Sequence, residues 1–560
     1  MLVDPNIVET YSCGKEGFIV ALCEAIGIPR LIDSALESPA GRPPEISYGV
    51  LAMMMMVNMC DDHHPLYRLN EYYKYKDLEG IFHQSVALDQ INDDRFGGFL
   101  DLFYKAGCQK IFAKASANAL ITYGVQIKNI NFDTTSKVMW GSYETAEGIL
   151  GSIQIDFGHS KDKRQDKKQI KYGIGCANGI VVDAIVLSGN KDDKTYNTDT
   201  LERLNDVLEN LQVEKSDFYY IADSALFSEK NLDMAADRSI KLITRMPDNV
   251  LLAKDAIDEV VTHLDGLDTI TIKDYKGQSY DYKVLEKTCD YKGHALKIAT
   301  YYSTKYKTQK EKTIRKKVSK ELDALDKLSK VLSKRAFACE EDSNLEIEKL
   351  KLKDLKNFKY HKIDFTIESK LKRRRGRPSL DPKADLVGYE YFLKLNSSQD
   401  EAFIHYEIQR ECCFVLCSND LVINGEEILK EYKTQDSVEK KFKQLKSPQF
   451  VNSIYLESPE RIEAFSYLML ICMLLLSTAE YVVRRGLCAD QDQVVGPGQV
   501  KMKKPTQRAI YDMFYSVRVR VIKHPNKPWE RSYANNLDES LIKILNYLDI
   551  PLETFIKGSS

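Results

Sequence analysis

The chain has 560 residues, of which 43% are hydrophobic and 29% charged, a composition that excludes a disordered or fibrous protein. Its 80 basic and 82 acidic side chains give a net charge of −2. This balance does not exclude a nucleic-acid partner, because basic residues can still cluster locally. At roughly 100–200 residues per domain, the length predicts three or four structural units.

The cysteines and the apolar segments indicate a protein of the reducing cytoplasm. The twelve cysteines are scattered from Cys13 to Cys488 without the paired spacing of a zinc site, so we expect them to be reduced. The N-terminus has no basic region followed by an apolar stretch, and no secretion signal is expected. The uncharged run 464–478 is shorter than the roughly 20 residues that span a bilayer, which predicts a buried helix and no membrane contact.

Residues 1–125 are predicted to form a helical N-terminal region. Apolar residues are dense in 17–32 and 48–60, and Asn92 is suited to cap the helix that follows it. Gly41 and the Pro43-Pro44 pair predict a break between helical segments.

Residues 126–247 are predicted to alternate between strands and helices. The run 127–132 alternates like a half-buried strand, and Asn178-Gly179 is a strong hairpin turn between strands over 168–177 and 180–187. The elements expected next are a helix over 199–211, a strand over 218–222, a helix over 228–236 capped by Ser228, and a strand over 240–244. This is the order of an RNase H-like sheet, so the predicted fold class is α/β with an RNase H-like mixed sheet.

Residues 248–420 interrupt that order and predict an inserted domain. Strand character returns in 250–305 and 388–419, while 306–356 is highly charged. Within the charged segment, a helical stripe is formed by Leu322, Leu325, Leu328, Val331 and Leu332. Such a stripe suits a projecting helical arm, which either contacts DNA or is solvated.

The core is expected to resume in 421–450, with one helix over 424–446 that ends at Ser447-Pro448. A helical C-terminal region is expected over 451–560, broken at Gly496-Pro497-Gly498.

Acidic residues follow the predicted strands at chemically useful places. Asp133 is expected to end the first strand and Asp223 the fourth, and ligands usually lie at strand ends in α/β sheets. On a continuous helix, Glu439 would share a face with Tyr432, Lys443 and Lys446. Phosphoryl transfer on DNA uses two divalent ions, and Mg²⁺ prefers carboxylate oxygens. From the helix alone, a solvated charged surface stays an open alternative.

An ordered series of motifs runs through most of the chain: NFDTTS, GHSKDKRQDKKQIKYGI, LSGNKDDKTYNTDTL, IADSALFSEKNL, ITRMP, EYKTQDSVEKKFKQLKSPQF and SPERIEAFSYLMLICMLLL. With these motifs the chain resembles the DDE transposases of bacterial insertion sequences, in the branch that carries an insertion domain before the catalytic glutamate. The long separation between Asp223 and Glu439 fits such an insertion.

The resemblance implies that Asp133, Asp223 and Glu439 are the catalytic, metal-binding acids. They would hold two Mg²⁺ ions per active site, with Mn²⁺ as a substitute. The family's tyrosine–arginine–glutamate–lysine signature maps onto Tyr432, Gln435, Glu439 and Lys446. Gln435 replaces the usual arginine, which removes one charged contact to a phosphate.

The resemblance also implies an activity and its partners. We expect metal-dependent strand cleavage and strand transfer at the ends of an insertion sequence, acting on terminal inverted repeats and target DNA. A homodimer in a synaptic complex, bound to the nucleoid in the cytoplasm, would carry out the reaction, and residues 1–125 would serve DNA-end recognition and dimerisation. Two alternatives stay open: a domesticated or inactive transposase that only binds DNA sequence-specifically, and a metal-dependent nuclease without strand transfer.

Two groups of side chains are predicted to contact DNA. The first surrounds the glutamate and comprises Tyr432, Gln435, Lys443 and Lys446. The second is KRRRGRP at 372–378, with Arg373, Arg374, Arg375 and Arg377, which resembles a hook that enters the minor groove. A solvated basic linker is the alternative for this second group. The basic loop 161–168 is likewise expected either to touch the DNA backbone or to be solvated.

Overall fold

A nine-stranded mixed sheet forms the centre of the protein, in the order β4-β3-β2-β5-β6-β13-β9-β8-β7. The computed structural model describes residues 7–36, 44–143, 152–273, 278–353, 355–373, 386–447, 454–524 and 527–558. The strands are β2 (Asn129–Val138), β3 (Gln169–Ala177), β4 (Ile180–Ser188), β5 (Tyr219–Ala222), β6 (Lys241–Arg245), β7 (Asp268–Lys273), β8 (Ser279–Tyr291), β9 (His294–Ser303) and β13 (Cys413–Ser418). β2 is antiparallel to β3 and parallel to β5, which is parallel to β6. The predicted mixed α/β class is therefore observed.

The first strands follow the sequence pattern closely, with one consequential exception. Asn178 and Gly179 both have positive φ angles, 53° and 80°, as the tight turn between β3 and β4 requires. β2 runs on to Val138, so the prediction that Asp133 ends its strand is wrong. Asp133 instead pairs with Ile174 in the middle of the strand. The polar residues that follow it suggested a loop, but Thr134 and Ser136 are buried within the sheet.

Two helices connect the first strands of the sheet. α8 (Asp193–Asn210) begins earlier than expected, because the side chain of Asp192 caps it by accepting from the backbone N–H groups of Lys194 and Thr195. α9 (Glu229–Asp237) is capped by Ser228, as predicted.

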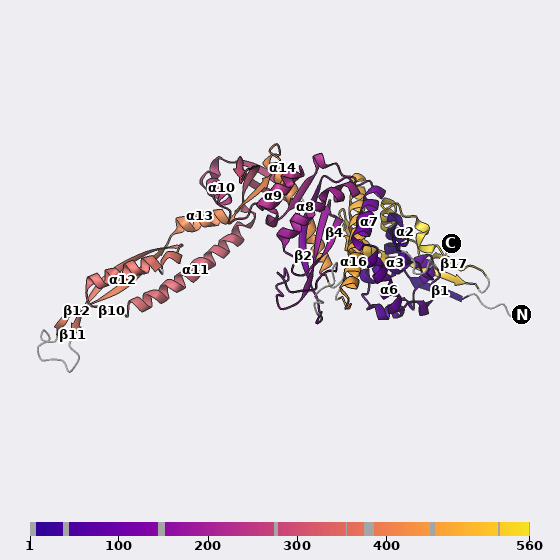
Figure 1. Cartoon of the computed structure of the whole chain (residues 1–560), viewed down its shortest axis with the longest axis horizontal. Helices are drawn as coiled ribbons and strands as arrows, with labels where there is room; N and C mark the ends of the chain where they lie inside the picture. Colours follow the sequence, from indigo (N-terminus) through magenta and orange to yellow (C-terminus); the bar gives the residue numbers. More distant parts are fainter. Residues whose placement is uncertain are drawn as a thin grey trace.

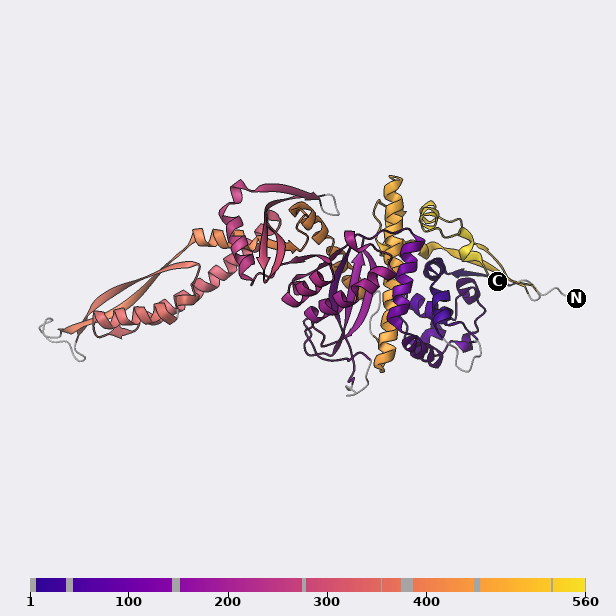
Figure 2. The same cartoon turned by 45° about the horizontal axis from the view of Figure 1, so that its top comes forward.

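The long helix α16 (Pro459–Ala489) lies at the centre of the main body. It runs between the sheet and the N-terminal helices in Figure 2, and it packs against β4, α3, α6 and α7. Among the described residues it is the one helix long and apolar enough to cross a membrane, but 89% of its apolar window is buried inside the protein. It extends well beyond the predicted run 464–478, and its burial is that of a core helix.

The N-terminal region contains α1 (Gly14–Ile26), α2 (Ile28–Ala35), α3 (Tyr48–Cys60), α4 (Leu69–Tyr73), α5 (Leu78–Phe82), α6 (Asp93–Lys105) and α7 (Cys108–Thr122). The helix expected over 48–60 is observed, and Asn92 caps α6. The segment 17–32 divides into two helices at Gly27, which has a φ of 79°. Of the predicted break, Gly41 and Pro43 lie outside the described residues.

The ends of the chain meet in a small sheet that the sequence pattern did not reveal. β1 (Ile7–Ser12) pairs with β16 (Arg518–Lys523), which pairs with β17 (Glu530–Tyr533). The C-terminal region also contains α17 (Gln507–Met513), α18 (Glu539–Tyr547), β14 (Val494–Gly496) and β15 (Val500–Met502). The two terminal regions, which were expected to be helical, contain these strands as well as helices, and the break at 496–498 is observed, with a φ of 71° at Gly498.

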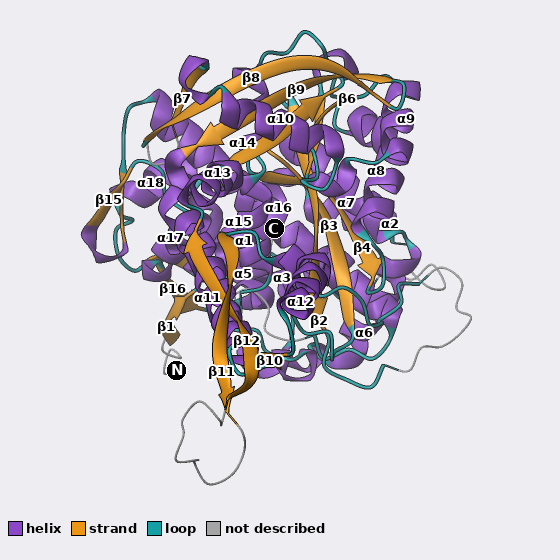
Figure 3. Cartoon of the chain, turned by 90° about the vertical axis from the view of Figure 1, so that its left-hand side faces the viewer, coloured by secondary structure: helices purple, strands orange, loops and turns teal. Residues whose placement is uncertain are grey.

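The segment between β6 and β13 both widens the central sheet and forms a long arm. α10 (Leu251–Thr262) and α13 (Glu401–Glu411) flank it, and neither helix was expected. The arm projects from the body in Figure 1 and is seen nearly end-on in Figure 3. It consists of α11 (Lys307–Leu332), β10 (Ala336–Phe337), α12 (Glu340–Lys353), β11 (His361–Arg373) and β12 (Leu386–Gln399).

The predicted apolar stripe of the arm is mostly observed. Leu325 and Leu332 are buried in a cluster with Leu393 and Leu395 of β12. Val331 is 64% exposed and does not belong to the stripe. The helical arm is therefore held together by packing against its own β-hairpin.

All twelve cysteines are free thiols, in agreement with the expected reduced state. Cys488 is exposed, whereas the others are buried or half-buried.

Candidate active site

Asp133 and Asp223 lie on neighbouring parallel strands. Phe132 of β2 is in register with Ala222 of β5, and each aspartate is the next residue along its chain. Adjacent strands are separated by about 4.8 Å, so the two acids lie side by side, Asp133 within β2 and Asp223 directly after β5. The Asp223 carboxylate accepts a hydrogen bond from the Ala225 N–H at 3.0 Å, which fixes the turn that follows β5.

The Asp133 carboxylate is half-buried, and its charge is partly compensated. Its Oδ1 atom accepts hydrogen bonds from the Thr134 N–H at 2.7 Å and from Lys161 Nζ at 2.9 Å. Burial and the negative charge of Asp223 raise the pKa of Asp133, Lys161 lowers it, and the pKa that results is about 6. A carboxylate in this environment gains from a nearby cation.

The Lys161 side chain makes further contacts next to Asp133. Its Nζ atom also donates to the Thr134 carbonyl at 2.5 Å and lies 3.5 Å from Asp193 Oδ2. Burial lowers the pKa of Lys161, but the charges of Asp133 and Asp193 outweigh it, so the pKa is raised and the ammonium stays charged. Lys161 of the basic loop thus contacts Asp133 and Asp193, and the contact of this loop with DNA stays a prediction.

The helix that carries Glu439 is shorter than predicted. The expected continuous helix over 424–446 is two helices, α14 (Gly425–Lys433) and α15 (Asp436–Leu445). Between them, the Thr434 hydroxyl exchanges hydrogen bonds with the Asn131 side chain of β2, at 2.8 and 3.0 Å. This tertiary contact interrupts the helix and docks α15 against β2 and β3. The inference that Tyr432 shares a helical face with Glu439 is therefore wrong, because the two residues lie on different helices.

The pKa of Tyr432 is nevertheless affected by the charges of all three acids. The pKa of its hydroxyl is raised to about 12, mainly through burial. The charges of Asp223, Asp133 and Glu439 contribute to the rise, and Arg245 opposes it. All three carboxylates are therefore near enough to act electrostatically on this tyrosine.

In the described residues, the three carboxylates are not arranged as a complete metal site. In the described ranges of the chain, no group of three or more histidine, cysteine, aspartate or glutamate side chains is arranged to hold a metal ion. Glu439 is exposed on α15. The structure thus brings Asp133 and Asp223 to adjacent strands and leaves Glu439 facing solvent at their side.

The remaining predicted DNA contacts are distributed over α15 and the arm. Lys446 Nζ lies 2.6 Å from Asp162 Oδ1 and so ties the loop 160–168 to the end of α15. Lys443 is exposed and Gln435 directly precedes α15. Arg373 closes β11, while Arg374, Arg375 and Arg377 lie outside the described residues.

Two residues of the site, Asp193 and Arg245, escaped the sequence analysis. Asp193 accepts from the Thr134 hydroxyl at 2.6 Å and lies 3.4 Å from Lys171 Nζ. Arg245 ends β6 beside Tyr432, within the motif ITRMP. Asp193 lies in the motif LSGNKDDKTYNTDTL, whose two adjacent aspartates were the signal available in the sequence.

Comparisons with known proteins give a limited picture. Residues 8–117 match the model of a domain of unknown function (DUF4277). No curated protein matches the chain.

Among solved structures, the chain is similar to two transposases. One is the piggyBac transposase in a synaptic complex with hairpin DNA, at 10% identity over 92% of this chain and 83% of that chain, with a TM-score of 0.37. The other is the Mos1 transposase in a paired-end complex with the left transposon end, at 11% identity over 37% of this chain and 60% of that chain, with a TM-score of 0.15. At these scores the likeness carries no argument about activity, which must be inferred from the site itself.

Proposed function

We propose that the protein is a DDE DNA transposase that cleaves and joins DNA strands at the ends of an insertion sequence. The observation that carries this proposal is the placement of Asp133 and Asp223 side by side at β2 and β5, with Glu439 on α15, the helix that packs against β2. Paired carboxylates on adjacent strands, joined by a third from a helix and bordered by cations, suit chemistry on a phosphodiester.

The sheet supports an RNase H-like core. Along the chain, β2, β3, β4, α8, β5, α9 and β6 follow the element order that the sequence predicted for such a core. In the sheet these strands lie in the order β4-β3-β2-β5-β6, with β2, β5 and β6 parallel. On this proposal the core comprises 126–247 and 421–450, and 248–420 is the insertion. Residues 1–125 would recognise DNA ends and dimerise, and 451–560 would form a helical support.

The donor set fits divalent metal ions. Asp133, Asp223 and Glu439 offer the hard carboxylate oxygens that Mg²⁺ and Mn²⁺ prefer, and Asp133 already holds the ammonium of Lys161 in this structure. When bound, two ions would stabilise the charge on the attacking and leaving oxygens.

The protein's own residues would position the DNA. Lys161 keeps the charge of Asp133 compensated until a stronger cation binds. Arg245 and Lys443 border the acids with positive charge, and they would hold the phosphates next to the scissile bond. Water would attack first, and the released 3′-hydroxyl would then attack a second phosphodiester.

The proposed partners are double-stranded DNA and a second copy of the chain. Two sites in a homodimer would hold both terminal inverted repeats in a synaptic complex on the nucleoid. Lys372 and Arg373 end β11 in the arm that projects from the body in Figure 1, where they would reach flanking or target DNA.

Cleavage of supercoiled DNA that carries the sequences flanking the gene tests the proposal. In the presence of Mg²⁺ the intact chain should nick or linearise the plasmid, and Asp223→Asn should not. Asp206→Asn, an exposed change on α8, is the matched control and should cleave normally. Equal behaviour of the intact chain and Asp223→Asn would overturn the proposal in favour of a DNA-binding protein. A joining assay with a pre-cut end separates a transposase from a nuclease.

A further inference from the structure

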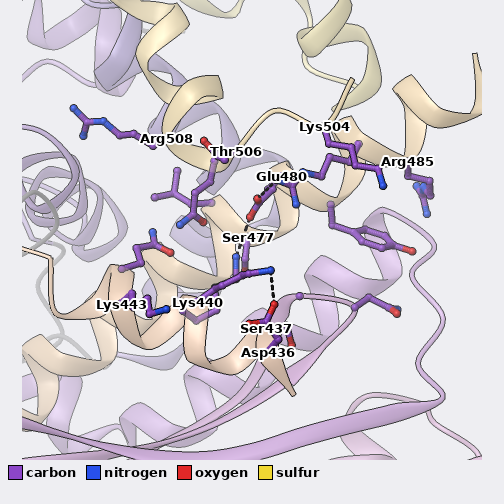
Figure 4. Close-up of a pocket in the computed structure, with 18 of the residues that line it drawn as sticks. Asp436, Ser437, Lys440, Lys443, Ser477, Glu480, Arg485, Lys504, Thr506 and Arg508 are labelled. Atoms are coloured by element: carbon purple, nitrogen blue, oxygen red, sulfur yellow. Dashed lines mark hydrogen bonds and ion pairs between the residues drawn. The ribbon is translucent and has the colours of Figure 1, made fainter. Parts of the chain in front are cut away.

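A large basic groove lies between α15, α16 and α17, and α15 also carries Glu439. Its volume is about 1360 Å³, and it is lined by eight cationic side chains and two acidic ones, Asp436 and Glu480. Figure 4 shows Lys440 and Lys443 on α15, Arg485 on α16 and Lys504 in the segment that leads into α17, whereas Arg508 extends outward and lies 2.7 Å from Asp512. Three elements distant in sequence thus direct positive charge into one space.

The two acids of the groove are already neutralised. Glu480 lies 2.9 Å from Lys441 Nζ and 2.6 Å from an Arg484 nitrogen, and Asp436 lies 2.6 Å from Lys440 Nζ. Lys443 and Lys504 have no ionic or hydrogen-bond partner among the described residues. The groove therefore holds positive charge that the protein itself does not compensate.

The walls also contain polar atoms without partners. Ser437 Oγ, Gln444 Oε1, Gln507 Oε1 and Tyr511 Oη line the groove or its floor and are buried without a hydrogen-bond partner in the described part of the chain. The Tyr511 side chain is only 3% exposed. Folded proteins rarely leave such atoms unsatisfied, so their concentration in one place indicates that a polar ligand completes the site.

The groove lies next to Glu439 on the surface of α15. Val438 and Leu445 face the core, and successive residues of a helix are turned by 100°. Viewed down the axis of α15, Lys443 lies next to Glu439, and the groove-lining residues Lys440 and Gln444 lie further round the helix in the same direction. A strand that passes Glu439 would therefore meet Lys443 and continue into the groove.

We propose that this groove binds the phosphodiester backbone of the DNA duplex whose scissile strand lies at the acids. The inference deepens the proposed transposase function and rests on it. The groove exceeds the roughly 300–1,000 Å³ of small-molecule pockets, and its uncompensated cations suit a repeating anion. Its position makes it the path for the DNA next to the cleavage point.

The salt dependence of DNA binding tests the groove directly. The probe is a fluorescein-labelled DNA duplex, titrated with the full chain at a series of salt concentrations. Replacing Lys504 with Ala should lower the slope of log affinity against log salt by about 0.9, the value for one lost phosphate contact. Lys114→Ala is the matched control, since Lys114 is exposed on α7 and has no partner among the described residues. An unchanged slope for Lys504→Ala would overturn the proposal.

Cys488 provides an independent readout inside the groove. It lines the groove and is the exposed cysteine of the chain. Attachment of a photoactivatable azidophenacyl group to Cys488 should crosslink the protein to bound DNA on irradiation, and Cys488→Ser should abolish the adduct. Binding without any adduct would contradict the proposed path.

These results separate the two proposals. A chain that neither binds nor cleaves DNA overturns the transposase assignment. A chain that cleaves DNA with an unchanged slope for Lys504→Ala and no adduct at Cys488 overturns the groove alone.

Discussion

Replacing Asp133 with Asn should stabilise the metal-free protein at neutral and basic pH. The folded protein raises the pKa of Asp133 from 3.8 to about 6, mainly through burial. The folded state therefore binds this proton more tightly than the unfolded chain, and ionisation destabilises the fold. The cost is absent below the unfolded pKa of 3.8 and fully present above the folded pKa of about 6.

The magnitude follows from the size of the shift. About two pKa units correspond to about 3 kcal/mol, since each unit is worth 1.36 kcal/mol. Asparagine keeps the acceptor oxygen for Thr134 and Lys161 but removes the charge. Asp133→Asn should thus be about 3 kcal/mol more stable than the intact chain at pH 8, with the difference falling as the pH approaches 4.

Urea unfolding between pH 4.5 and about 8.5 measures this difference. Asp206→Asn serves as the control for a surface change of the same kind, and its effect should not vary over this range. Added Mg²⁺ should stabilise the intact chain and leave Asp133→Asn unaffected, because only the intact chain binds the ion. If the variant is equally or less stable at pH 8, the account of Asp133 as a half-buried charge awaiting a cation fails.

Three further outcomes are expected. Lys161→Gln should move the acidic limb of the pH–cleavage profile to higher pH, because Lys161 lowers the pKa of Asp133; an unmoved limb would contradict that role. Tyr432→Phe should reduce the rate of DNA cleavage about tenfold, which corresponds to about 1.4 kcal/mol for one hydroxyl group. The DNA affinity measured by fluorescence anisotropy should not change. Equal losses of cleavage and of affinity would indicate a role in binding instead. Arg531→Ala should destabilise the protein by about 3–5 kcal/mol in urea unfolding, because it strands Asp77 in a buried ion pair of 2.7 Å; a loss below about 1 kcal/mol would show that the pair is not structural.

Local patterns predicted the elements whose partners are close in sequence. The hairpin of β3 and β4 depends on a two-residue turn, and α3 and α9 depend on their own apolar residues and caps. For the same reason Asp223 was correctly placed at the end of β5.

Elements that depend on distant partners could not be predicted. β1 gains its hydrogen bonds only from β16, near the other end of the chain. The interruption before α15 depends on the contact between Thr434 and Asn131, which no helical periodicity records. The position of Lys161 against Asp133 likewise depends on how the loop 160–168 folds over β2.

The candidate site was therefore predictable in its residues but not in its geometry. The motifs singled out Asp133, Asp223 and Glu439, yet the placement of Asp133 in mid-strand and the separation of Tyr432 from α15 follow from tertiary contacts. Arg245 belongs to the site because β6 ends there, and Asp193 belongs to it because α8 begins there.

Metal-directed cleavage of the backbone tests the convergence of the three acids most directly. With Fe²⁺ in place of Mg²⁺, DNA bound, and ascorbate and peroxide added, hydroxyl radicals cut the chain next to the ion. Cuts near Asp133, Asp223 and Glu439 that appear together, and that excess Mg²⁺ suppresses together, are the predicted result. Cuts at the two aspartates with α15 left intact would contradict the three-carboxylate site.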